Sequence, residues 1–283
     1  MTIFSRKPKQ PDLGDYFIRK TGLAQIYNKM LAYNAGVPVS WDDLTDQWCD
    51  GFADFLKGEV SKSSAATYFA VIRNFLSAAR KAGYNFPAQN YKELLTSKKD
   101  KTVKTYLNLD ELKRLEEYEP QNETERSVRA DFLISAYTGL RKSDFCKITR
   151  DNVDEEGNLI YISEKTNTKA ALPLKPLVWE LLAIPRKEVT LTTYINTLRR
   201  MCKACCIDSL VQVIHGGIKR SGEKWEFVSS HTGRISFATN LHLLGLDIFT
   251  ISRMMGHSDS KMTESYICAE KRELPDTVKI YFK

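Results

Sequence analysis

The second half of the sequence contains side chains suited to chemistry on a phosphodiester. Four short segments, YTGLRKSDF, EKTNTK, SSHTGRISFAT and MMGHSDSKMTESY, contain two arginines and two histidines, together with lysines and tyrosines. The candidate catalytic residues are Arg141, Lys165, His231, Arg234, His257 and Tyr266. Attack on a phosphodiester requires an activated nucleophile and neutralisation of the phosphate charge, and phenol, imidazole and guanidinium groups can supply both.

Each of these segments has an ordinary explanation when it is taken alone. An arginine near a helix end usually forms a surface salt bridge, and a histidine after a glycine usually caps a helix. His231 and Arg234 are three residues apart, which on a helix places both on one face, but such pairs are common by chance. The order and spacing of all four segments together favour a catalytic site.

The four segments resemble the active-site boxes of the tyrosine recombinase (phage integrase) family, which includes lambda-type integrases and Xer-type recombinases. Residues 138–141 match its T-G-x-R box, and Lys165 stands eight residues before Pro173, like the hairpin lysine of the family. The pair His231 and Arg234 matches its H-x-x-R box.

The last box departs slightly from the family pattern. Met255 replaces the usual leucine of the L-G-H box, which ends at His257, and Tyr266 follows nine residues later. Asp144 stands where the family more often has glutamate. The motifs cover about residues 107–270, and all six catalytic positions carry the expected residue types.

The resemblance implies a role for each residue type. Arg141 and Arg234 would hold the two non-bridging phosphate oxygens, for which a planar guanidinium suits better than lysine. Tyr266 would attack the phosphorus, and because a phenol has a pKa near 10 it must lose its proton on attack.

The remaining three residues would handle protons and the phosphate. His231 would assist the loss of the phenol proton, His257 would hydrogen-bond to the phosphate, and Lys165 would protonate the departing 5′-oxygen. The implied product is a 3′-phosphotyrosine link and a free 5′-hydroxyl, without metal, ATP or another cofactor.

Three other functions compete with a recombinase. A type IB topoisomerase uses similar chemistry, but the short chain and the Xer-like boxes favour a recombinase. A catalytically silent DNA-binding accessory protein of the same fold is disfavoured by the intact set of six residues. A helical protein with no role on DNA would leave the whole set as coincidence.

The sequence predicts a mainly α-helical protein with a small antiparallel β-sheet. In the second half, Asn108 and Glu111 have capping-box spacing at the start of a helix. Alternating residues predict one hairpin, with strands at about 159–163 and 168–174 and Lys165 near the turn. Further helices are expected at about 192–206, 233–244 and 247–255.

Helical periodicity also covers the N-terminal part of the chain. It predicts a first helix at about 16–33 and a third at about 64–82, which ends before Gly83. A second helix is expected to follow a capping-box pair at Ser40 and Asp43 and to end at about Leu56. A short helix is expected at 91–95. By pattern and length these helices resemble the core-binding (SAM-like) DNA-binding domain of the family.

A basic segment separates the two halves. We expect a core-binding domain at 1–97, a linker at 98–106 and a catalytic domain at 107–283. The linker contains Lys98, Lys99, Lys101 and Lys104, which could lie along a DNA backbone or could simply keep a connector soluble.

Composition is consistent with a DNA-binding protein of the cytoplasm. Residues 1–104 contain 16 Lys and Arg against 10 Asp and Glu, whereas the net charge of the whole chain is +7. A basic third suits phosphate contact, although charge alone fits a solvated surface equally well.

The sequence shows no export signal or membrane-spanning run. Cys202, Cys205 and Cys206 are expected as core thiols rather than zinc ligands, because no second ligand pair follows.

The family resemblance also implies how the protein assembles. The partner is double-stranded DNA, and the complex is a homotetramer on two DNA sites that can be monomeric when free. The apolar residues Val278, Ile280, Tyr281 and Phe282 could dock on a neighbouring subunit or pack on their own domain.

Overall fold

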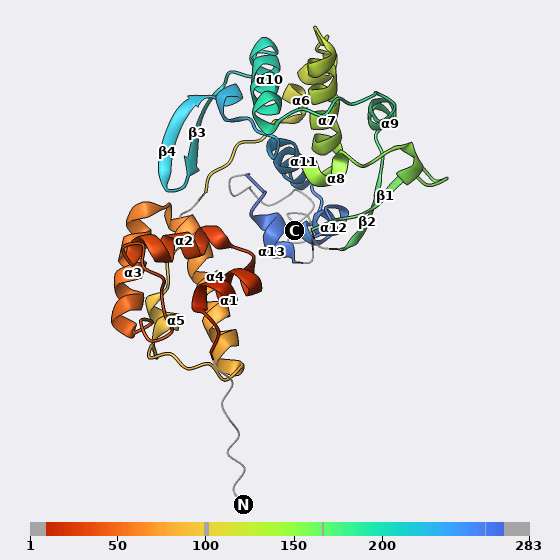
Figure 1. Cartoon of the computed structure of the whole chain (residues 1–283). Coiled ribbons are helices and arrows are strands. Elements are labelled where there is room, and N and C mark those ends of the chain that lie inside the picture. The colour runs from red at the N-terminus through yellow and green to blue at the C-terminus, as the bar shows by residue number, and fades with distance from the viewer. Residues whose placement is uncertain (1–9, 99–101, 166, 258, 269–283) are drawn as a thin grey trace, which may run out of the picture. The chain divides into compact units, whose positions relative to one another are not determined.

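The structure is a computed structural model that describes residues 10–98, 102–165, 167–257 and 259–268. It is mainly helical with two small antiparallel sheets, which confirms the predicted fold class and adds a second sheet (Figure 1). The chain divides into two compact units, the first ending at Thr102 and the second beginning at Val103, with residues 215–218 assigned to the first.

The first unit is a group of five helices around an aromatic core. Its helices are α1 (Leu13–Thr21), α2 (Ala24–Tyr33), α3 (Asp46–Glu59), α4 (Lys62–Lys81) and α5 (Tyr91–Leu94). Phe17, Phe52, Phe69 and Phe75 are buried there. The helices predicted over 64–82 and 91–95 are thereby confirmed.

Two details of the N-terminal prediction were wrong. The single helix expected at 16–33 is two helices, because Gly22 has a φ of 66° and closes α1 with a hydrogen bond to Ile18. Ser40 and Asp43 do exchange hydrogen bonds, but in a turn. Helix α3 starts later, where the Thr45 hydroxyl accepts from the Trp48 amide.

The second unit contains the remaining helices. They are α6 (Leu109–Glu117), α7 (Glu123–Thr138), α8 (Lys142–Phe145), α9 (Pro176–Leu182), α10 (Leu191–Ala204), α11 (Thr232–Leu243), α12 (Ile248–Met254), α13 (Ser260–Glu264) and the 3₁₀ turns η1 (Arg150–Asn152) and η2 (Lys224–Phe227). The predicted capping box is present: Asn108 caps the Glu111 amide, and the Glu111 carboxylate accepts from the Asn108 amide. The helices expected at 192–206, 233–244 and 247–255 correspond to α10, α11 and α12.

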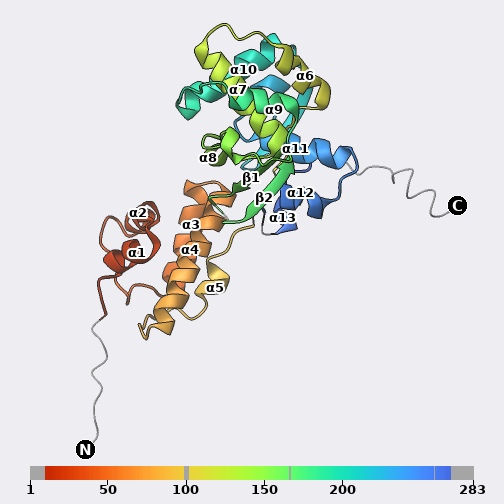
Figure 2. The same cartoon turned by 90° about the vertical axis from the view of Figure 1, so that its right-hand side faces the viewer.

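The predicted hairpin is present in this unit. Strands β1 (Asn158–Ile162) and β2 (Lys169–Pro173) are antiparallel, with Asn158 opposite Pro173 and Ile162 opposite Lys169. Leu159, Tyr161, Ala170 and Leu172 face the core. Helix α12 packs against β2 and against α13, as both views show (Figures 1 and 2).

A second hairpin was missed by the sequence prediction. Strands β3 (Leu210–His215) and β4 (Ile218–Glu223) form it, with Gly216 and Gly217 at the turn and φ values of 58° and 79°. A two-residue Gly-Gly turn is a hairpin signal. The Gly-Gly pair was not recognised as a hairpin turn because the strands beside it are mostly exposed and lack a clear alternation of apolar and polar residues.

The centre of the second unit is the packing of α11 on α7. Both helices are buried over most of their length. A Cβ atom at Gly233 would lie 3.0 Å from the side chain of Ser135, so a glycine allows the two helices to approach closely. This contact joins the end of α7, where Arg141 follows, to the start of α11, which carries Arg234.

The three cysteines near the end of α10 differ in burial. Of the three thiols expected in the core, Cys202 is buried, whereas Cys205 is partly exposed and Cys206 is exposed beyond the end of α10. The prediction was therefore right for one of them.

Within the described residues, no helix has both the length and the apolar character to cross a membrane.

Candidate active site

Arg141 follows the left-handed turn that ends α7. Gly139 has a φ of 69°, and an added Cβ would lie 2.6 Å from the Phe237 ring, so the position requires glycine. Arg141 Nη1 donates to Ser163 Oγ at 2.8 Å and lies 3.9 Å from an Asp144 carboxylate oxygen. Its buried Nη2 has no hydrogen-bond partner among the described residues.

Arg234 is fully buried in the first turn of α11. One Nη donates to the Gly139 carbonyl and the other to the Met255 carbonyl at 2.9 Å, while no described group pairs with Nε. Desolvation and the positive charge of Arg141 lower the pKa of Arg234. Each of these two neighbouring guanidinium groups has a buried N–H donor without a described partner. A bound anion could accept hydrogen bonds from both donors and would offset their positive charge.

His257 lies against Arg234 on the other side of this site. Its Nε2 is hydrogen-bonded to Arg234 Nη2, and its Nδ1 lies 2.8 Å from Thr263 Oγ1. Because a guanidinium can only donate, Nε2 must accept and the proton is assigned to Nδ1. Desolvation, with repulsion from Arg234 and Arg141, lowers the pKa of His257 to about 3, so the ring is neutral.

Tyr266 lies in the turn after α13, with its ring among these groups. The side chain is 8% exposed, and its ring stacks on His257 with centroids 5.5 Å apart and planes at 14°. The guanidinium carbon of Arg234 is 5.7 Å from the ring centroid. The Tyr266 carbonyl accepts from Thr239 on α11 at 3.0 Å, which fixes the turn to the core.

His231 precedes α11 and its ring also lies beside Tyr266. Its ring centroid is 5.0 Å from that of Tyr266, at an angle of 53°. Desolvation, together with the positive charges of Lys104, Arg234, Arg141 and Lys165, lowers the pKa of His231 to about 4. The residue is exposed, so water moderates both effects, but their direction leaves the imidazole able to accept a proton.

Lys165 lies at the turn between β1 and β2, as expected, and is exposed. It contributes to the positive potential at His231 but makes no described contact with the other five residues. The structure therefore places five of the six candidates together and the sixth at the edge of the site.

Several supporting residues were not predicted from the sequence. Ser163, Thr239 and Thr263 hold Arg141, Tyr266 and His257 respectively. Serine and threonine are too common for their positions to indicate such roles. Only the fold brings them to the site.

The four linker lysines have different surroundings. Lys98 is exposed, and Lys99 and Lys101 lie outside the described residues. Lys104 lies at the candidate site, with its Nζ 4.6 Å from the Tyr266 ring centroid. The apolar residues of 278–282 also lie outside the described residues.

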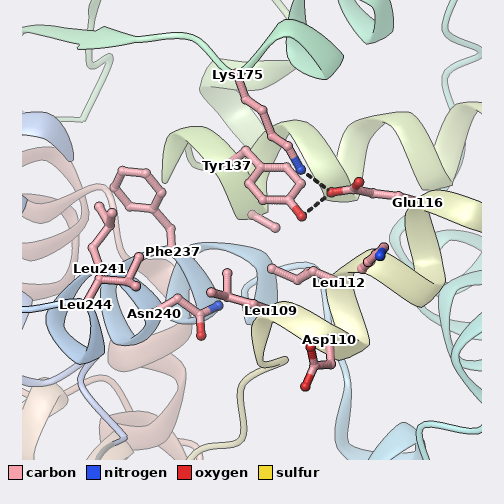
Figure 3. Close-up of a pocket in the computed structure, with 12 residues that line it drawn as sticks. Leu109, Asp110, Leu112, Glu116, Tyr137, Lys175, Phe237, Asn240, Leu241 and Leu244 are labelled. Carbon is pink, nitrogen blue, oxygen red and sulfur yellow. Dashed lines mark hydrogen bonds and ion pairs between the residues drawn. The ribbon is translucent and has the colours of Figure 1, made fainter.

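A separate pocket of about 530 Å³ is formed by α6, α7 and α11 (Figure 3). It is mostly apolar, with Leu112, Phe237 and Leu241 in its wall. At one side Lys175 and Tyr137 both bond to the Glu116 carboxylate. None of the six candidate residues lines it, so this pocket is not part of the candidate active site.

Comparisons with known proteins show what the chain is similar to. Residues 105–273 match the phage integrase family, and residues 19–93 match the phage integrase SAM-like domain. The chain is 30% identical over 230 residues to the tyrosine recombinase XerD of Staphylococcus aureus, covering 76% of this chain and 74% of that protein.

Solved structures share the fold. A lambda integrase dimer bound to a COC′ core site has a TM-score of 0.64 at 18% identity, covering 93% of this chain and 98% of the other. The Tn1549 transposon integrase in complex with a circular intermediate DNA has a TM-score of 0.65 at 14% identity, covering 96% and 99%.

Proposed function

The chain belongs to the phage integrase family and is a tyrosine site-specific recombinase that acts on DNA, and we propose that Tyr266 is the nucleophile that cuts the strand. The observation that supports this assignment best is the surrounding of the Tyr266 ring by His231, His257 and Arg234. An imidazole can accept the phenol proton and a guanidinium can hold a phosphate oxygen, so these neighbours suit a nucleophile.

The proposed reaction begins when the two arginines bind the scissile phosphate. Arg141 Nη2 and Arg234 Nε are buried donors that lack a described partner, and a phosphate oxygen could satisfy each of them. Fixed donors of this kind stabilise the charge that grows on the phosphate as it is attacked. Asp144, beside Arg141, would orient that guanidinium.

The attack then exchanges one phosphoester for another. The Tyr266 oxygen forms a bond to phosphorus, its proton passes to His231, and the bond from phosphorus to the 5′-oxygen breaks. Lys165 gives a proton to that 5′-oxygen, which leaves a 3′-phosphotyrosine and a free 5′-hydroxyl. Because the number of phosphoester bonds is unchanged, ATP is not needed, and we propose that no metal ion is needed either.

His257 has a different proposed role from the one expected for it. Its Nε2 accepts from Arg234, so in this arrangement it orients the guanidinium. To hydrogen-bond a phosphate through the same nitrogen, the ring would first have to gain a proton there.

We also propose how the protein works on DNA. Domains at 1–97 and 107–283 would grip the duplex, with Lys98, Lys99, Lys101 and Lys104 in the linker near the backbone. The lambda integrase relatives are described as a dimer on a core site and a tetramer on a Holliday junction, which supports a homotetramer on two sites here. We propose that it acts in the cytoplasm of a bacterial cell, which is supported by its proposed DNA substrate and its bacterial relatives.

The test is trapping of the covalent intermediate. The protein is incubated in EDTA with a duplex that carries the repeats flanking the gene and a nick near the cleavage point. The short fragment with the new 5′-hydroxyl can then diffuse away, so that the covalent adduct cannot be rejoined. We expect a protein–DNA adduct on a denaturing gel and none with Tyr266→Phe, which keeps the ring but removes the nucleophilic oxygen. No adduct on a site that the protein demonstrably binds, in EDTA or magnesium, would contradict the proposal.

A further inference from the structure

Among the linker lysines within the described residues, Lys104 lies at the candidate site. Its Nζ donates a hydrogen bond to the Ser265 carbonyl at 3.0 Å and lies 4.6 Å from the centroid of the Tyr266 ring. One ammonium group thus contacts both the turn that carries the tyrosine and the aromatic face of the tyrosine itself. A cation over an aromatic ring is attracted by the electron density of that face.

The backbone beside Lys104 is fixed. Val103 pairs with Ile214 in an antiparallel bridge whose two N–H···O bonds are both 3.1 Å long. The next residue, Thr105, is buried, and the Leu107 amide donates to Ser236 on α11. The lysine therefore extends from an anchored segment, unlike a lysine on a free connector.

The ammonium is also partly removed from water. Lys104 is half-buried, and desolvation lowers its pKa, partly offset by the nearby thiol of Cys268. A lysine that merely solubilises a linker extends its charge into solvent. Lys104 instead gives one of its three donors to a main-chain carbonyl at the nucleophile.

The charge of Lys104 also acts on His231. The groups that face this imidazole are the cations Lys104, Arg234, Arg141 and Lys165 and the ring of Tyr266. Among the cations Lys104 makes the largest contribution to the lowered pKa of His231. Lys104 thus favours the neutral imidazole, which is the form that can accept the phenol proton.

We propose that Lys104 is a positioning residue for the nucleophile, which holds the Ser265–Tyr266 turn and the tyrosine ring in the orientation needed for attack. The proposal rests on the proposed role of Tyr266. It assigns Lys104 to the cleavage step rather than to affinity for DNA alone. Loss of its charge should slow the step that forms the adduct even when all DNA is bound.

The experiment compares Lys104→Met, which keeps most of the length of the side chain but removes its charge, with Lys104→Arg, which keeps the charge. Lys113→Met is the matched control, because Lys113 is an exposed lysine that pairs with Glu117 on α6. Adduct formation on the nicked duplex is followed with protein in excess, so that the rate reports cleavage. DNA affinity and its salt dependence are measured separately in a Tyr266→Phe background.

We expect Lys104→Met to form the adduct about tenfold more slowly at saturation, as misplacement of a reacting group does. Lys104→Arg should recover most of this rate, and Lys113→Met should match the wild type. The acid limb of the rate profile should move to higher pH in Lys104→Met, because His231 would then bind a proton more readily. A role in folding alone would not shift this limb.

Two results would overturn the proposal. If Lys104→Met cleaves at the wild-type rate once saturated, and only its affinity and salt dependence fall, Lys104 is a phosphate contact. If both Lys104 variants are equally slow, melt at lower temperature and keep the wild-type pH profile, the role is structural. An adduct that persists in Tyr266→Phe would instead contradict the proposed function, and the two failures are therefore distinguishable.

Discussion

At the scale of single residues, the surroundings of the candidate site lower the pKa of two histidines, His231 and His257, and so favour their neutral form. His257 is buried and has two positively charged neighbours, Arg234 and Arg141, so a proton on its ring is strongly disfavoured. In an unfolded chain a histidine has a pKa near 6.5. Between about pH 3 and pH 6.5 the unfolded chain therefore binds a proton at this position that the folded protein does not.

This difference predicts how stability depends on pH. As the pH falls through that window, the unfolded state gains protons and the free energy of unfolding decreases. His257→Gln keeps an acceptor for Arg234 but cannot titrate, so its free energy of unfolding should fall less between pH 7 and pH 4, by about 1–3 kcal/mol. Urea denaturation at several pH values measures this. Parallel curves for the two proteins would show that the pKa of His257 is not lowered.

The residue types of the site could be predicted from the sequence, whereas their partners could not. Arg141, His231, Arg234, His257 and Tyr266 were chosen by type and spacing, and the fold brings these five together. For Lys104 the sequence predicts a linker lysine that either contacts the DNA backbone or only keeps the connector soluble. Its bond to the Ser265 carbonyl joins residues 161 positions apart, and no local pattern reports such a distance.

At the scale of elements, the position of Arg234 depends on the turn at the end of α7. The Gly139 carbonyl accepts from this arginine, and the left-handed backbone of Gly139 is what directs the carbonyl toward it. A side chain at position 139 would meet the Phe237 ring as well as adopt a strained φ. The turn therefore links the T-G-x-R and H-x-x-R boxes directly.

Substitution of this glycine provides a test. Gly139→Ala should lower the free energy of unfolding by about 2–4 kcal/mol, since strain and overpacking add, and should strongly reduce adduct formation. The control is Gly157→Ala in the turn before β1, where φ is also positive, 82°, but nothing lies within 4 Å of the added Cβ. That variant should lose only about 1 kcal/mol and keep its activity. Equal losses in both variants would mean that the contact with Phe237 is unimportant.

The elements themselves were predictable where a local signal was strong. The capping box at Asn108 and the alternation in β1 each identified their element, because both depend on residues close in sequence. The break at Gly22 was missed because the apolar periodicity continues across it. The β3–β4 hairpin was missed because its strands are largely exposed and lack a buried face.

At the scale of the whole molecule, the question is whether one chain contains a complete site. Arg141, His231, Arg234, His257 and Tyr266 all come from the second unit of a single chain. If the proposed roles hold, a chain with this arrangement should cut the strand beside its own Arg141 and Arg234. Rejoining to a new partner still requires a second DNA site, since the cleaved link needs a different 5′-hydroxyl.

Mixing two inactive variants distinguishes cleavage within one chain from cleavage between chains. Tyr266→Phe lacks the nucleophile, and Arg141→Gln retains the tyrosine but loses a phosphate donor. If each chain cuts with its own tyrosine, a mixture of the two variants on a two-site nicked substrate should form no more adduct than Arg141→Gln alone. If the tyrosine reached the site of a neighbouring subunit, some assemblies would pair the intact Tyr266 of one variant with the intact Arg141 of the other. Adduct formation would then rise well above that background, and the arrangement of Tyr266 against its own Arg234 would have to open before cleavage.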